Sequence, residues 1–221
     1  MQRAILFDWD GTLAHTLPIW MSWYKAFSLF LSLELTDHQI AVQLFGHNDL
    51  VQKFIITPNQ LRQAEDYADS KVDLSTEFAQ VTLHPGAQKT IKKLHDQGYS
   101  LAITTSSDID LFIKPVLERQ NLTSYFDALV DRHQVKNNKP APDIFLKALD
   151  ILNVEPKNSI IVGDGDKDIV AAKTAGIKNV LFYPPEHHII YSEQYIKTLS
   201  ADRIITDLSE LPVVIEKLFH A

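Results

Sequence analysis

The sequence predicts an α/β fold in which helices cover a parallel sheet and a helical subdomain is inserted near the N-terminus. Short, nearly continuous apolar runs occur before residue 14 and again after about residue 83, as expected of strands buried on both faces of a parallel sheet. Amphipathic helical patterns separate these runs, and such alternation implies right-handed crossovers. Residues 15–82 show helical patterns and no strand pattern.

Six apolar runs are expected to form the strands. They are residues 4–7, 100–104, 128–130, 159–162, 179–183 and 203–206. The helices between them have recognisable ends. "PGAQKTIKKLHDQG" stops at Gly98 and "KDIVAAKTAG" at Gly176, which are typical C-terminal glycines, and "APDIFLKALDILN" places Pro142 in its first turn.

The chain is therefore divided into an α/β core, residues 1–14 and 83–221, and a helical insert, residues 15–82. Within the insert, Thr57 followed by Pro58 is a typical helix start. Four aromatic residues share one helical stripe and are interpreted as the core of a helical bundle, in preference to a ligand-binding site: Trp20, Trp23, Phe27 and Phe30.

Composition limits the classes of function. The 221 residues carry a net charge of −7, which argues against a general binder of nucleic acid or of anionic membranes. No apolar run approaches the ~20 residues of a membrane span, and the N-terminus does not resemble a signal peptide, so a cytoplasmic location is expected. The absence of cysteine excludes disulfides and thiolate chemistry. The expected partner is a small molecule.

Reactive side chains follow the expected strands at the edge where ligands of open parallel sheets bind. They are Asp8 and Asp10, Thr105 and Ser106, Lys139, and the acids of "GDGDKD", Asp164, Asp166 and Asp168. Each has an ordinary structural alternative: a solvated turn, a helix cap, an exposed lysine, or acids that favour a helix N-terminus. Their convergence on one edge favours a site that combines a metal, a nucleophile and neutralisation of phosphate charge.

The opening motif suggests which metal. In extended backbone Asp8 and Asp10 point to the same side, and Gly11 permits a sharp turn behind them. Two close carboxylates require a cation or cationic side chains to neutralise them, and this suggests Mg²⁺, which prefers oxygen ligands. A calcium loop at Asp164 is excluded because Ile169 and Ala175 occupy positions that require Gly and Glu.

Four segments, in order, resemble the signature motifs of the haloacid dehalogenase-like superfamily, and specifically its phosphatases of the phosphoglycolate phosphatase type. They are "DWDGTL", "AITTSS", "KPAPDIF" and "VGDGDKDIVAAKTAG". The resemblance spans nearly the whole chain. It implies a Rossmann-like three-layer core with a parallel sheet, interrupted after the first motif by a small all-helical cap.

The resemblance also implies an activity, Mg²⁺-dependent hydrolysis of a small phosphorylated metabolite by a monomer or homodimer. Asp8 would attack phosphorus to form an aspartyl-phosphate, and Asp10 would serve as general acid and then general base. Thr105 and Lys139 would bind the transferring phosphoryl group.

Further roles follow from the same resemblance. Mg²⁺ would be held by Asp8, the backbone carbonyl of Asp10 and Asp164, with Asp168 nearby. Thr12 would support Asp10, and Ser106 would contact the substrate. "LFGHNDLVQK" matches the specificity loop of the cap in position, so the candidates for contacts with the leaving group are Gly46, His47, Asn48 and Lys53.

Several alternatives stay open. A sugar phosphomutase of the β-phosphoglucomutase type would share both aspartates but use a histidine where this chain has Trp20, and a catalytically idle relative would only bind a phosphorylated ligand. His15 stands where the family usually has an acid. His187 and His188 lie in a connection, residues 184–201, that is longer than usual and are expected to be exposed.

Overall fold

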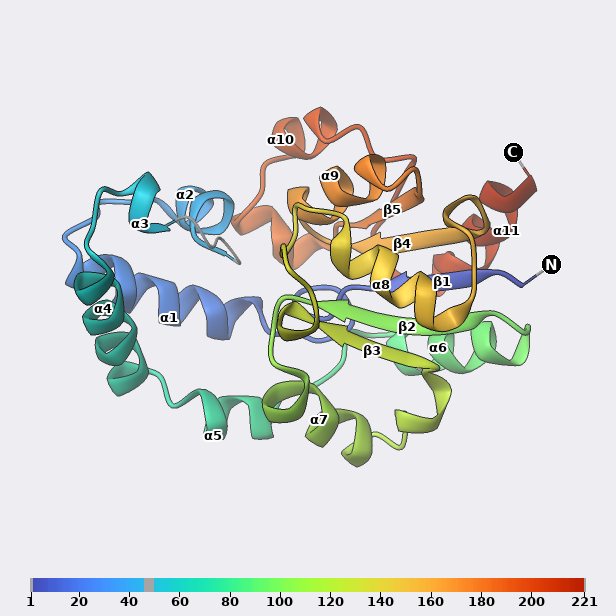
Figure 1. Cartoon of the computed structure of the whole chain (residues 1–221), viewed down its shortest axis with the longest axis horizontal. Coiled ribbons are helices and arrows are strands. Elements are labelled where there is room, and N and C mark those ends of the chain that lie inside the picture. Colours follow the sequence, from blue (N-terminus) through green and yellow to red (C-terminus); the bar gives the residue numbers. More distant parts are fainter. Residues whose placement is uncertain (1, 46–49, 221) are drawn as a thin grey trace.

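The computed structural model describes residues 2–45 and 50–220. Its centre is a six-stranded parallel sheet with the order β3-β2-β1-β4-β5-β6 (Figure 1). The strands are β1 (Ala4–Phe7), β2 (Ser100–Thr105), β3 (Ala128–Asp131), β4 (Ser159–Gly163), β5 (Lys178–Phe182) and β6 (Arg203–Ile205). The predicted Rossmann-like α/β core is confirmed, and each predicted strand agrees to within one residue at either end.

Helices cover both faces of the sheet because successive residues of each buried strand point to opposite sides. Ile5 and Phe7 of β1 belong to the hydrophobic cluster on one face, and Ala4 and Leu6 belong to the cluster on the other. The first face is covered by α6 (Ala87–Asp96), α7 (Lys114–Arg119) and α11 (Leu211–His220), and the second by α8 (Asp143–Leu152) and α9 (Asp166–Thr174).

The ends of these helices largely follow the predicted pattern. Gly98 and Gly176 have positive φ angles, +83° and +68°, just beyond α6 and α9. Pro142 is the N-cap residue of α8, one position before the first turn in which it was expected.

The insert consists of helices that leave β1 and return to α6, as predicted. They are α1 (Leu17–Phe30), α2 (Asp37–Gln43), α3 (Leu50–Lys53), α4 (Pro58–Lys71) and α5 (Leu74–Ala79). The start of α4 was predicted correctly: the Thr57 hydroxyl accepts a hydrogen bond from the Gln60 N–H, and the Gln60 side chain accepts one from the Thr57 N–H. Figure 1 shows α1 to α4 grouped at the left, beyond one end of the sheet.

The two chain segments that connect the core to the insert, residues 13–15 and 82–84, lie side by side. Ala14 and Leu83 form an antiparallel bridge, the His15 N–H donates to the Thr82 carbonyl (3.0 Å), and the His84 N–H donates to the Leu13 carbonyl (2.9 Å). This pairing fixes where the insert begins relative to the end of β1. The division of the chain into domains at residues 14 and 83 stays a prediction.

The long connection between β5 and β6 reaches the insert. It contains the short helices η5 (Pro185–Ile189) and α10 (Glu193–Thr198), and Ile190 and Tyr191 pack in the same hydrophobic cluster as residues of α1 and α2. Nδ1 of His38 lies 2.9 Å from the Ile190 carbonyl oxygen. The connection therefore joins core and insert. Among the residues described, no helix is long and apolar enough to cross a membrane.

Candidate active site

The order of the strands reverses at β1, which is the place where open α/β sheets bind ligands. Phe7, at the end of β1, is in register with Ile103 of β2 and Val162 of β4. The residues that follow these strands, including Asp8 and Asp164, therefore meet at one edge of the sheet.

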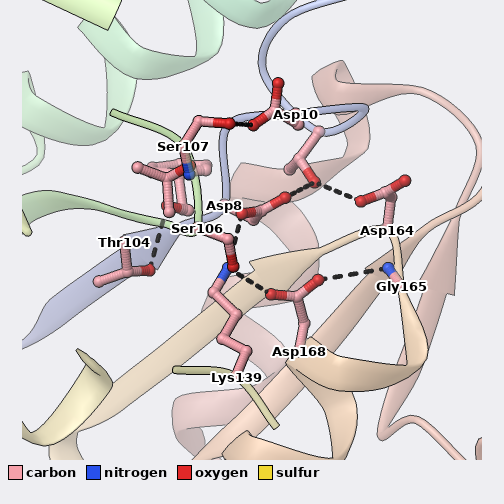
Figure 2. A network of polar contacts seen from close by, with 12 residues as sticks. Asp8, Asp10, Thr104, Ser106, Ser107, Lys139, Asp164, Gly165 and Asp168 are labelled. Carbon is pink, nitrogen blue, oxygen red and sulfur yellow. Dashed lines mark hydrogen bonds and ion pairs between the residues drawn. The ribbon is translucent and has the colours of Figure 1, made fainter. Parts of the chain in front are cut away.

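Three carboxylates and one ammonium group form the floor of this site (Figure 2). Asp8, Asp164 and Asp168 are buried, and each offers a carboxylate oxygen within 4.8 Å of the others. Nζ of Lys139 lies between two of them, 2.6 Å from Oδ1 of Asp8 and 2.7 Å from Oδ1 of Asp168. These four residues come from distant parts of the chain and converge as predicted.

The charges of this cluster are not balanced by the protein alone. Burial raises the pKa of Asp8 to about 7 in spite of the Lys139 ammonium, and burial together with Asp8 and Asp168 raises the pKa of Asp164 well above its usual value. Burial lowers the pKa of Lys139, but its ion pairs with Asp168 and Asp8 outweigh this effect and keep the pKa raised. One buried ammonium faces three buried acids, so the oxygen-rich cluster suits a hard divalent cation such as Mg²⁺.

The turn behind β1 brings Asp164 close to the first motif. Gly11 has a φ angle of +73°, and a Cβ atom there would lie 2.4 Å from Oδ2 of Asp164, so only glycine fits. The Thr12 hydroxyl lies 3.3 Å from Oδ1 of Asp164 and 3.4 Å from Oδ2 of Asp8. The expectation that Thr12 supports Asp10 is therefore wrong, because this tight turn directs its buried side chain toward the other two acids.

Asp10 is held separately by three hydrogen-bond donors. Oδ1 accepts from the Thr16 hydroxyl (2.8 Å) and from the Trp20 indole N–H (2.7 Å), and Oδ2 accepts from the Ser107 hydroxyl (2.6 Å). These three residues were not predicted as part of the site. Trp20 lies four residues after Thr16 on the same helical face, and Ser107 follows the predicted strand-end hydroxyls, so spacing could have indicated both.

The other predicted core residues occupy more indirect positions. Thr105 is fully buried and its hydroxyl oxygen accepts a bond from the Ser107 N–H (3.0 Å). Ser106 lines the cavity described below and donates to Oδ1 of Asn138 (3.0 Å). Asp166 also lines this cavity. The contact of Thr105 and Ser106 with a substrate stays a prediction.

The predicted specificity loop is only partly covered by the structure. Gly46, His47 and Asn48 lie outside the described residues. Nζ of Lys53 donates to the Gln43 carbonyl (3.2 Å), and Lys53 is not among the described residues that line the cavity.

A cavity of about 630 Å³ opens above the carboxylates and extends under the insert. Its floor includes Asp8, Asp10 and Lys139, and aromatic side chains of the insert form much of its wall. Trp23 and Phe27 belong to a hydrophobic cluster, as predicted, but they line the cavity as well. The interpretation of the aromatic stripe as bundle core alone is therefore incomplete, and Phe30 at its end is 40% exposed.

A pair of buried histidines lies behind the acidic cluster. His187 is 1% exposed, which contradicts the expected exposure. Its ring is buried because η5 folds back and packs it near His84 and Phe182. His188 is exposed, as predicted. Burial lowers the pKa of His187 to about 3, and burial together with His15 lowers the pKa of His84 to about 4. Nδ1 of His187 lies 3.8 Å from Oδ2 of Asp164, and this contact is not an ion pair at neutral pH because the imidazole is uncharged.

Known proteins resemble the chain in both sequence and fold. The family model for haloacid dehalogenase-like hydrolases matches residues 5–182. A phosphoglycolate phosphatase from Aquifex aeolicus is 31% identical over 81% of this chain and 84% of its own length. A pyrophosphatase, PpaX, from Halalkalibacterium halodurans is 31% identical over 58% of this chain and 57% of its own length. A hydrolase structure from Pseudomonas syringae has the same fold, with a TM-score of 0.79 and 21% identity over 98% of this chain and 99% of that one.

Proposed function

The chain belongs to the haloacid dehalogenase-like hydrolase family, and we propose that it is a Mg²⁺-dependent phosphatase that cleaves a small phosphate monoester through an aspartyl-phosphate on Asp8. The observation that carries this proposal is the buried group of Asp8, Asp164 and Asp168 around Lys139, at the floor of a cavity of about 630 Å³. A cavity of this size fits a small organic ligand.

In the first step, an oxygen of Asp8 attacks phosphorus while the bond from phosphorus to the leaving oxygen breaks. Asp10, protonated at that moment, gives its proton to the leaving oxygen. In the second step Asp10 accepts a proton from a water molecule that attacks phosphorus, which releases inorganic phosphate and restores Asp8. The bonds from Thr16, Trp20 and Ser107 would orient the Asp10 carboxyl group for both transfers.

The remaining residues would hold the metal ion or neutralise the negative charge of the phosphoryl group. Asp8, the backbone carbonyl of Asp10 and Asp164 would hold Mg²⁺, with Asp168 nearby. The ion would neutralise negative charge on the phosphoryl oxygens. Lys139 would add a positive charge on the other side of Asp8. The Thr105 oxygen accepts a bond from Ser107, which leaves its hydrogen for a phosphoryl oxygen.

The names of the relatives support cleavage of phosphate compounds but differ in the compound, phosphoglycolate in one and pyrophosphate in the other. The phosphomutase alternative lacks support because Trp20 occupies the position of the histidine that it would use, and the Trp20 indole is engaged with Asp10. An idle binding protein would not require both Asp8 and Asp10 to face the same cavity.

The proposal is tested with p-nitrophenyl phosphate in the presence of Mg²⁺ and after removal of metal with EDTA. Wild-type protein should release p-nitrophenolate only with metal, and Asp8→Asn should abolish the reaction. Asp96→Asn, which changes a carboxyl group that is 77% exposed on α6, is the control and should keep wild-type activity. Activity that persists in Asp8→Asn would falsify the proposed nucleophile.

A further inference from the structure

The cavity has an outer compartment that the chemistry at Asp8 does not use. Its aromatic wall is contributed by α1, by Phe45 two residues beyond the end of α2, and by Phe112 of the core. These side chains are Trp20, Trp23, Tyr24, Phe27, Phe45 and Phe112. Because Asp8 and Lys139 lie at the floor of the same cavity, the leaving group of a monoester bound at Asp8 would extend toward this wall.

The rings form a connected wall. The ring centroids of Trp23 and Tyr24 are 4.9 Å apart at 83°, those of Tyr24 and Phe45 are 5.1 Å apart, and those of Trp20 and Phe112 are 6.1 Å apart at 88°. Such a wall buries apolar groups, and the negative face of an aromatic ring attracts cations. A two-carbon leaving group would leave most of this wall uncovered.

Helix α4 adds negative charge to the same compartment. Leu61, Glu65 and Asp69 are spaced four residues apart, so they share one helical face, and all three line the cavity together with Asp66. Like charges at this spacing destabilise a helix. Glu65, Asp66 and Asp69 are exposed residues, and partial burial, followed by the charges of Asp69 and Asp66, raises the pKa of Glu65. Oδ1 of Asp69 accepts a hydrogen bond from the Trp23 indole N–H (2.7 Å), which ties one acid to the aromatic wall.

The cations that line the cavity do not balance these acids. Lys139 is paired with Asp8 and Asp168 at the floor. Burial lowers the pKa of Lys167, whose Nζ donates to the Phe45 carbonyl, so this lysine is less readily charged than an exposed one. Arg132 of the core lines the cavity and Arg62 of α4 lies outside its described lining, and both of these exposed residues offset part of the charge on Glu65. The described part of the outer compartment therefore combines aromatic faces with an excess of negative charge.

This inference rests on the proposed function: we propose that the leaving group of the natural substrate is apolar and carries a positive charge, as in a phosphorylated amino alcohol or quaternary ammonium alcohol. The aromatic rings would cover its apolar surface, and Glu65, Asp66 and Asp69 would attract the cation. A leaving group with a carboxylate, such as that of phosphoglycolate, would meet repulsion from the same acids.

The test compares substrates that differ in charge. Choline phosphate and 3,3-dimethylbutyl phosphate have nearly the same shape, because a carbon atom replaces the quaternary nitrogen, and phosphoglycolate supplies a negative charge. All three are assayed with Mg²⁺ in wild type, in Glu65→Gln with Asp69→Asn, and in Glu77→Gln. Asn at position 69 keeps an acceptor for Trp23. Glu77 is an exposed acid of α5 outside the described cavity lining, and its variant controls for the loss of an exposed acid from the insert.

Wild type is expected to prefer choline phosphate to its neutral analogue by roughly tenfold in kcat/KM. The double variant should lose most of this preference and Glu77→Gln should retain it. Because both substrates are measured in each protein, the difference in their intrinsic reactivity cancels from the comparison. Equal preference in wild type and the double variant, or faster hydrolysis of phosphoglycolate than of choline phosphate, would overturn the inference. A protein that also fails to hydrolyse p-nitrophenyl phosphate would instead count against the proposed function.

Discussion

The indole N–H of Trp20 donates a 2.7 Å hydrogen bond to Oδ1 of Asp10. This contact joins the first helix of the insert to the candidate acid and base of the core. Thr16 and Ser107 complete the set of donors around the same carboxyl group. The orientation of Asp10 thus depends on how the insert packs on the core.

Trp20→Phe removes this hydrogen bond but keeps an aromatic ring in the wall. Since a hydrogen bond to a charged group contributes roughly 1.5–3 kcal/mol, kcat should fall about tenfold or more. Steady-state kinetics with p-nitrophenyl phosphate measures the effect. Trp23→Phe is the matched variant, because it also loses an indole N–H but one that is bonded to Asp69, and it should change KM more than kcat. Wild-type kcat in Trp20→Phe would show that this bond does not position Asp10.

Gly163→Ala is expected to disrupt the acidic cluster by steric contact alone. A Cβ atom at Gly163 would lie 2.4 Å from Cγ of Asp168, which would displace that carboxylate from Lys139. The cost should be about 1–3 kcal/mol of unfolding free energy, as for other overpacked sites, and urea denaturation measures it. At Gly165 the nearest atom would lie 3.6 Å away, so Gly165→Ala should be close to wild type. Equal stability of the two variants would contradict this account.

Binding of Mg²⁺ should release protons near neutral pH. The pKa of Asp8 in the metal-free protein is about 7, and a metal ligand must be deprotonated, so affinity for Mg²⁺ should fall as the pH drops below about 7. Isothermal titration calorimetry in two buffers with different ionisation enthalpies counts the protons released. The prediction would be wrong if the heats were identical in both buffers and the affinity were equal at about pH 6 and about pH 8.

The buried histidines should make the protein sensitive to acid. An unfolded histidine binds a proton near pH 6.5, whereas the folded rings of His84 and His187 do so only near 4 and 3. Between these values the unfolded state holds more protons, so their contribution to stability is fully present above pH 6.5 and is lost as the pH falls. Each ring should contribute a slope of up to about 1.4 kcal/mol per pH unit. His187→Gln should flatten the decline between about pH 6.5 and pH 5 in urea denaturation, and an unchanged slope would exclude a neutral His187.

Most of the fold could be predicted because its strands are buried on both faces and therefore appear as continuous apolar runs. Asp8, Lys139, Asp164 and Asp168 could be placed together because the ends of parallel strands share one edge. The orientation of individual side chains in turns was not predictable from spacing. Thr12 illustrates this, since its direction depends on the tight turn at Gly11.

Contacts between segments that are distant in the sequence also could not be predicted, and they explain the wrong prediction for His187. His187 was expected to be exposed because it lies in a long polar connection, but this connection folds back against β5 and the insert, and the ring is buried. For the same reason, the sequence did not indicate that the aromatic stripe lines the cavity as well as packing in a hydrophobic cluster. Helical spacing indicates which residues share a face, but not whether that face also borders a cavity.

The central claim, that Asp8 receives the phosphoryl group, is tested most directly by a pre-steady-state burst experiment on Asp10→Asn with substrate in excess. p-Nitrophenolate leaves without the help of an acid, whereas hydrolysis of the intermediate requires the base, so phosphorylated enzyme should accumulate. Rapid mixing with p-nitrophenyl phosphate and Mg²⁺, followed by acid quenching and peptide mass spectrometry, should show a burst of about one p-nitrophenolate per enzyme and one phosphoryl group on Asp8. Turnover with no burst and no modified peptide, or a phosphoryl group on another residue, would contradict the account.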